Sequence, residues 1–83
     1  MNEETKQKFI DFGALNYSDE RMAQIIGVSE TELRKMLKDG GSEAMEIGQA
    51  RYEYAIDKKL MDMALGGDIK ALGELNKRKR VKR

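Results

Sequence analysis

The side chains that can do chemistry in this chain are carboxylates, amines, guanidinium groups and hydroxyls, because the sequence contains no Cys and no His. Without these two residues the chain lacks the usual zinc ligands, disulfides and histidine-activated nucleophiles of small catalytic sites. Glu43 and Glu46 lie one helical turn apart, but their neighbours indicate no metal site, and a solvated surface explains both. We therefore expect a non-catalytic protein that needs no cofactor and no metal.

A second chemically useful set lies between residues 29 and 38, where hydroxyls, carboxylates and cations follow one another. Arg34 and Lys35 are cations that donate hydrogen bonds to anions, and hydroxyls donate hydrogen bonds as well. Six polar residues of this segment are candidate contacts to such a ligand: Ser29, Glu30, Thr31, Arg34, Lys35 and Lys38. Whether they act together depends on the elements that position them.

The charges are unevenly distributed along the chain, although the formal net charge is only +1. The last seven residues, KRKRVKR, hold six bases and no acid, whereas the preceding 76 residues hold ten bases and 15 acids, a net charge of −5. A basic segment of this kind binds polyanions without sequence specificity, or it is a solvated terminus. Its candidate DNA contacts are Lys77, Arg78, Lys79 and Arg80.

The absence of proline and the positions of glycine indicate an all-α fold. We expect helices at about Glu4 to Leu15, Asp19 to Ile26, Ser29 to before Asp39, Glu43 to Leu65, and Ile69 to Lys79. The side chains expected to cap them are Ser18, Ser29 with Glu32 in a capping box, Ser42 and Asp68. Gly48 is the only interruption of the long fourth helix and costs it under about 1 kcal/mol.

The length and hydropathy of the chain bound its class further. A chain of 83 residues forms one small domain, whose core is marginal without a partner. No apolar run approaches the roughly 20 residues that span a bilayer. The first residues, MNEETKQKF, are polar and unlike a signal peptide. We therefore expect a cytoplasmic protein that does not bind membranes.

The second and third expected helices carry the spacing typical of two helices that cross over a short turn. Ala23 is small where the helices approach, Gly27 allows the positive φ of a turn, and Leu33 is an inward aliphatic residue. The apolar interior positions are Met22, Ile26, Val28, Leu33 and Met36. Over about Asp19 to Lys38 the sequence resembles the helix-turn-helix family of DNA-binding domains. The alternative is a plain helical hairpin that uses the same residues for packing alone.

The resemblance implies that the third helix enters the major groove of double-stranded DNA, with Arg34 and Lys35 as its main contacts. Glu30 and Glu32, in the first turn of the third helix, weaken this interpretation, because their carboxylates repel phosphate. Glu32 is explained by capping, whereas Glu30 is not. We therefore expect a single unit to bind DNA weakly, with a dependence on salt and on repeated contacts.

The long helix carries two opposed apolar stripes. One contains Met45, Tyr52, Ile56, Leu60 and Met63, and the other Ile47, Ala50, Tyr54, Met61 and Leu65. Two stripes imply contacts with two bodies, namely the helix-turn-helix core and a neighbouring subunit, because self-association is a usual remedy for a small core. The expected homo-oligomer interface comprises Ile47, Tyr54, Met61 and Leu65. The rival explanation is that the first and last helices of the same chain cover both faces.

The segment ALGGDIKALGELNKRKR, from Ala64 to Arg80, resembles the end of the core of bacteriophage terminase small subunits. The matching positions are Ala64, Leu65, Gly67, Asp68, Lys70, Ala71, Leu75 and Arg78. The resemblance spans about Tyr17 to Arg78. It implies a non-catalytic subunit that recognises a viral packaging site, assembles into a ring and delivers DNA to the terminase large subunit. The chain stops soon after Arg78, unlike larger members, which leaves ring formation and the completeness of the chain open.

The sequence thus predicts a helix-turn-helix DNA-binding domain over residues 1–40, packing and oligomerisation helices over 41–79, and a basic tail over 80–83. The leading function is viral genome packaging in the host cytoplasm, as a terminase small subunit. A small phage or bacterial helix-turn-helix transcription regulator is the alternative, and a helical adaptor that binds protein without DNA is the third. A dimer in solution favours the regulator, and a closed ring of many copies favours the terminase.

Overall fold

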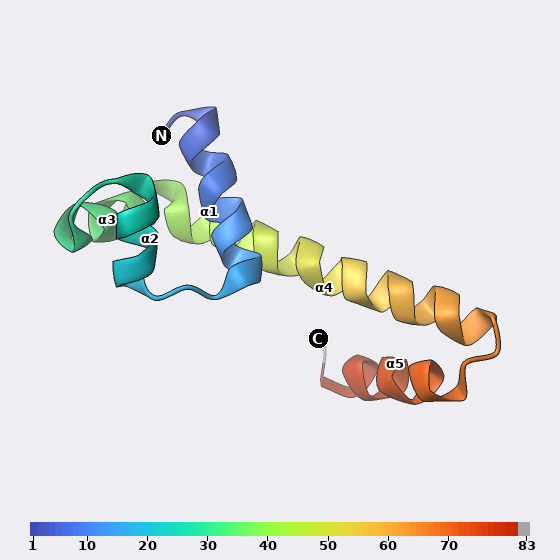
Figure 1. Cartoon of the computed structure of the whole chain (residues 1–83). Helices are drawn as coiled ribbons and strands as arrows, with labels where there is room; N and C mark the ends of the chain where they lie inside the picture. Colours follow the sequence, from blue (N-terminus) through green and yellow to red (C-terminus); the bar gives the residue numbers. More distant parts are fainter. Residues whose placement is uncertain (82–83) are drawn as a thin grey trace. The chain divides into compact units, whose positions relative to one another are not determined.

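The structure is a computed structural model that describes the backbone of residues 1–81 and the side chains of residues 1–79. It contains α1 (Glu3–Leu15), α2 (Asp19–Ile26), α3 (Glu30–Met36), the π-helical segment η1 (Leu37–Gly41), α4 (Ser42–Leu65) and α5 (Ile69–Val81) (Figure 1). No strand occurs over these residues. The all-α prediction is confirmed, as are the long helix and the shorter C-terminal helix.

Side-chain caps fix the start of four helices, and three of them were predicted. Ser18 Oγ accepts a hydrogen bond from the Arg21 N–H at 3.2 Å, and Asp68 Oδ1 accepts one from the Ala71 N–H at 3.0 Å. The Glu32 N–H donates to Ser29 Oγ at 3.1 Å, which is one half of the expected capping box. Asn2 caps α1 in the same way, so that this helix begins one residue earlier than expected. Each such cap satisfies an N–H that the helix leaves without a partner.

The prediction that Ser42 caps the long helix is wrong. Ser42 has helical backbone angles, with φ −63° and ψ −41°, and its N–H donates to the Leu37 carbonyl. The chain passes from α3 to α4 through η1, which contains non-helical angles at Asp39 and a positive φ of 103° at Gly40. Because η1 supplies acceptors to the first turn of α4, no separate side-chain cap is needed there.

The chain divides into two compact units, the first comprising Met1–Arg51 and the second beginning at Tyr52. The division falls inside α4, so this helix contributes its first turns to one unit and its later turns to the other. The boundary predicted after residue 40, between a DNA-binding domain and the packing helices, stays a prediction.

The first unit has an apolar core built from three helices and the start of α4. Its fully or almost fully buried side chains are Phe9, Phe12, Met22, Ala23, Leu33 and Ala44. Phe9 and Phe12 meet edge to face, with ring centroids 5.7 Å apart. Such aromatic pairs contribute about 0.5–1.5 kcal/mol beyond the burial of their surface. This core fixes which face of α3 turns inward.

Two glycines allow α1 and the first part of α4 to approach backbone to backbone. Gly13 of α1 lies against the backbone of Met45, and Gly48 of α4 lies against the backbone of Ile10. A Cβ atom at either position would overlap those backbone atoms. Gly48 is therefore not merely a weak point in a long helix, as its sequence position suggested, but the site of a close helix crossing (Figure 1).

The second unit is a hairpin made of the later turns of α4 and of α5. Its turn is closed by backbone hydrogen bonds, including one from the Asp68 N–H to the Met63 carbonyl at 3.1 Å. Ala71 is the one buried apolar side chain between residues 52 and 79. Within residues 1–81, no helix is long and apolar enough to cross a membrane.

Candidate nucleic-acid interface

The contact between α2 and α3 is built from the residues that the sequence predicted for it. Leu33 is fully buried, and Met22 and Ala23 are almost so. The N–H groups of Gly27 and Val28 both donate to the Ala23 carbonyl, at 2.8 and 3.0 Å, which closes the turn on the small residue. Gly27 has a φ of 88°, a conformation that glycine adopts without strain.

The burial of Leu33 determines what α3 presents on its other side. Every predicted contact of this segment is solvent-exposed: Ser29, Glu30, Thr31, Arg34, Lys35 and Lys38. Lys38 lies beyond α3, in η1. The structure thus gathers the six residues on one short segment of the first unit, and they are the candidate nucleic-acid interface.

Glu30, which the sequence left without an explanation, lies beside the main predicted contact. Arg34 Nη2 is 3.9 Å from Glu30 Oε2, and the two side chains are 59% and 48% exposed. Exposed pairs of this kind contribute about 0–1 kcal/mol, because water screens them and both side chains lose freedom. The guanidinium therefore stays accessible to another partner, although Glu30 lowers the positive potential around it.

The predicted basic contacts on α5 fall into two groups. Lys77 and Lys79 form the exposed group, and Lys77 Nζ lies 3.8 Å from Glu74 Oε1. Arg78 instead donates from Nε to Asp57 Oδ1 of α4, and both side chains are about three-quarters buried, at 28% and 24% exposure. Phosphate contact by Arg78 would have to compete with this ion pair. The side chain of Arg80, together with Lys82 and Arg83 of the predicted basic tail, lies outside the described residues.

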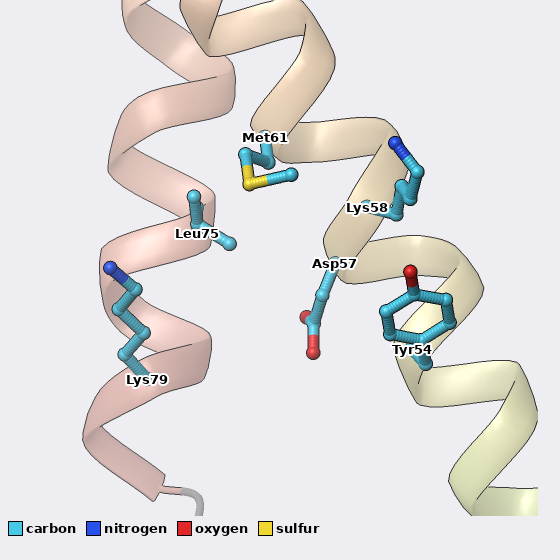
Figure 2. Close-up of a pocket in the computed structure, with 6 residues that line it drawn as sticks. All are labelled: Tyr54, Asp57, Lys58, Met61, Leu75 and Lys79. Carbon is cyan, nitrogen blue, oxygen red and sulfur yellow. The ribbon is translucent and has the colours of Figure 1, made fainter.

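The residues predicted for self-association are all exposed, and they belong to different units. Ile47 is in the first unit, whereas Tyr54, Met61 and Leu65 are in the second, with exposed fractions of 66%, 42% and 81% for these three. Tyr54 and Met61 border a groove of about 270 Å³ between α4 and α5 (Figure 2). The other lining residues are Asp57, Lys58, Leu75 and Lys79.

Sequence reasoning missed the Asp57–Arg78 pair, although a signal for it was present. The two residues have opposite charge and lie at nearly equal distances along the chain from the Gly67 turn. Residues that are equidistant from the turn of a helical hairpin face one another, so the pairing follows once the hairpin is assumed. The inward position of Leu75 beside it could be found in the same way.

Comparison of the chain with known proteins found no match. No protein-family model, no curated protein and no solved structure matches the chain. The two candidate surfaces are the exposed polar segment opposite Leu33 and the groove between α4 and α5.

Proposed function

We propose that this chain is a non-catalytic DNA-binding subunit that reads double-stranded DNA with α3. The observation that supports the proposal is the exposed set of Arg34, Lys35 and Lys38 on the segment whose inward side is anchored by Leu33. The major groove of DNA admits an α-helix, and arginine donates two hydrogen bonds to a guanine edge. A capped helix fixed by a buried leucine holds such donors in a constant register.

The charge balance of the first unit indicates how strongly one copy binds. Residues 1–51 hold ten acids and seven bases, a net charge of −3, so this unit repels phosphate at long range and α3 must bind against that repulsion. Residues 52–83 hold five acids and nine bases, a net charge of +4. Sequence reading by α3 and general phosphate attraction by the second unit are therefore properties of different parts of the chain.

Self-association is the second part of the proposal. Linked copies bind neighbouring DNA sites with an effective concentration that far exceeds that of free copies, which offsets the weak affinity of each. The exposed apolar side chains of the second unit, among them Tyr54, Met61 and Leu65, support such an association.

Within this class, we favour recognition of a viral packaging site, as in terminase small subunits. The support is the segment from Ala64 to Arg80 together with the order of the helices. A small transcription regulator uses the same α2–α3 unit as a dimer on a palindrome. The solution mass separates these roles, because the packaging role requires more than two copies.

A salt series of gel shifts on the full chain tests DNA binding. Duplexes selected by the protein from a random library are compared with unselected duplexes, for the wild type and for Arg34→Ala. We expect Arg34→Ala to weaken binding of the selected duplex by about 1–3 kcal/mol and to leave unselected duplexes nearly unchanged. Lys59→Ala, which removes an exposed charge far along the sequence from α3, is the control for loss of a cation. Equal effects of Arg34→Ala on both duplexes would refute reading by α3.

A second variant separates phosphate attraction from sequence reading. Neutralising Lys79 and Arg80 should weaken binding to all duplexes similarly and lower the slope of log affinity against log salt. If selected and unselected DNA respond differently, the assignment of general phosphate contact to the end of the chain is wrong.

A further inference from the structure

The inward residues of α4 and α5 follow a single heptad frame, which we call the seam. It comprises Asp57, Met61, Ala64, Asp68, Ala71, Leu75 and Arg78. Successive members are four and three positions apart in alternation, which is the spacing of the inward a and d positions of a coiled coil. All are buried or half-buried except Met61, which borders the groove (Figure 2).

The heptad frame passes without a shift through the turn that separates the two helices (Figure 1). α4 ends at Leu65 and α5 begins at Ile69, yet the seam keeps its spacing across Gly66 and Gly67. A closed hairpin does not require this, because turns of different length place the second helix at different rotations about its axis. One straight helix does require it, since all seven residues then lie within about 100° of one another.

The seam is also complementary to itself about the turn. The residues at nearly equal distances from the turn are Asp57 with Arg78, Met61 with Leu75, and Ala64 with Ala71. In the hairpin the first two form an ion pair, and the next two face one another across the groove (Figure 2). Two straight helices that run in opposite directions and cross at the turn residues form each of these pairs twice, as a two-fold contact requires.

Two features hold a single chain in the hairpin form. Gly67 has a φ of 99°, which is not helical, and Asp68 Oδ1 caps α5 by accepting a hydrogen bond from the Ala71 N–H. Near the middle of two paired straight helices, the Asp68 carboxylates of the two copies approach one another, and like charges placed together disfavour a contact. A lone chain therefore stays closed, and an open pair becomes populated only as the concentration rises.

The hairpin loses little when it opens onto a second copy. Between residues 52 and 79 it buries one apolar side chain, Ala71, and the pairs of the seam form again between the copies. Leu65, which is 81% exposed beside the turn, then flanks the middle of the seam and gains a neighbour. Exchange of an identical element between copies is a low-cost route to a dimer, because it reuses contacts that the single chain already makes.

We propose that two copies of the chain exchange α5. In each copy α4 and α5 join into one helix, and α5 packs along the seam on α4 of the other copy, with Asp57 of each copy paired to Arg78 of the other. The exchange leaves Ile47 and Tyr54 exposed for contacts between such pairs, which an assembly of more than two copies requires. The inference rests on the self-association part of the proposed function and is independent of DNA binding.

Charge reversal on either side of the ion pair tests the exchange in the full chain without DNA. Asp57→Arg alone and Arg78→Asp alone each bring like charges together, in the closed hairpin as well as in a pair of identical copies. An equimolar mixture of the two variants restores both ion pairs, but only between copies. In sedimentation equilibrium we expect the mixture to form a two-chain species and to associate at least about tenfold more tightly than either variant alone.

Two controls accompany the mixture. Asp57→Arg and Arg78→Asp in the same chain restore the ion pair within that chain, so this double variant should match the wild type in helix content by circular dichroism and in association. Lys58→Asp and Asp62→Lys change the net charge in the same two directions, but they belong to an exposed pair within one helix and outside the seam. Their mixture should associate no more tightly than its components.

The turn offers a second, independent test. Alanine is strained at the positive φ of Gly67 but is favoured in a straight helix, so Gly67→Ala should strengthen association at least about tenfold. Gly73→Ala is the matched control, because Gly73 is helical in the closed and the open form and a Cβ atom there meets nothing within 4 Å. This control should leave the association constant unchanged.

Either of two results would overturn the inference. One is a charge-reversed mixture that associates no more tightly than its components although the double variant is folded, and the other is no gain in association from Gly67→Ala. If the wild type still associates, self-association uses other surfaces and only the exchange of α5 is wrong. If the wild type and the mixture are both single chains at every concentration, the self-association part of the proposed function fails as well. The gel shifts with Arg34→Ala then still decide, separately, whether α3 reads DNA.

Discussion

Gly48 of α4 lies against the backbone carbonyl of Ile10 in α1, where a Cβ atom has no room. Alanine has the better helix propensity, by up to about 1 kcal/mol, so propensity alone predicts that Gly48→Ala stabilises the protein. The overlap with backbone, which cannot rotate away, predicts the opposite. We expect a net loss of about 1–3 kcal/mol in the free energy of unfolding, measured by urea denaturation.

Gly73→Ala is the matched control for this prediction. Gly73 also lies inside a helix, but a Cβ atom there meets nothing within 4 Å. We expect a gain of up to about 1 kcal/mol from helix propensity. A similar sign for the two substitutions would contradict the close crossing of α1 and α4.

Removal of the cap of α3 tests whether this short helix depends on Ser29. Ser29→Ala leaves the Glu32 N–H without its acceptor and should cost about 1 kcal/mol, whereas Ser29→Asp keeps an acceptor and most of the stability. Thr31→Ala removes an exposed hydroxyl of the same helix and should change stability by less than about 0.5 kcal/mol. Thermal unfolding followed by circular dichroism measures all three.

Glu30→Gln should strengthen binding to all duplexes by about two- to fivefold at low salt. The substitution removes the carboxylate that accompanies Arg34 and that faces the phosphates in the proposed complex. The size corresponds to one exposed charge interaction of under about 1 kcal/mol. Gel shifts measure the gain, with Glu46→Gln on α4 as the control for net charge. An equal gain from Glu46→Gln would show that net charge alone, rather than the α3 surface, sets the affinity.

The Asp57–Arg78 pair should stabilise the hairpin more than an exposed pair does. A double-mutant cycle with Asp57→Asn and Arg78→Gln is expected to give a coupling free energy of about 1 kcal/mol, because both side chains are largely buried. The exposed pair of Lys58 and Asp62, at 3.3 Å, should give about 0.3–0.5 kcal/mol in the same kind of cycle. Hydrogen exchange of the amides of both α4 and α5 measures the two couplings, and equal couplings would refute the structural role of the Arg78 pair.

Local features of the fold could be predicted from the sequence because they depend on near neighbours. The bounds of α2 follow from Ser18 and Gly27, and the burial of Leu33 follows from its spacing after that glycine. The α3–α4 junction could not be predicted, because Gly40 and η1 replace the cap expected at Ser42. The conformation of this junction depends on how α3 and α4 pack with α1, and no short segment of the sequence encodes that packing.

The two candidate sites differ in the same way: one could be predicted from local spacing, whereas the other depends on residues that are distant in the sequence. The outward position of Arg34 and its neighbours follows from helical periodicity around Leu33. The groove is lined by residues on opposite sides of the Gly67 turn, such as Met61 and Leu75, and periodicity within one helix does not reveal that they lie together. The role of Gly48 was missed for a related reason, since only a partner helix makes the absence of a side chain useful.

The nearly empty interior of the hairpin has a consequence for the life of the protein. Ala71 is the one buried apolar side chain between residues 52 and 79, so in the proposed assembly a neighbouring copy would stabilise the packing of α4 and α5, and its stability would rise with the concentration of the protein. In that assembly, chains at low concentration would expose Tyr54 and Met61 to proteases, whereas association would shield them.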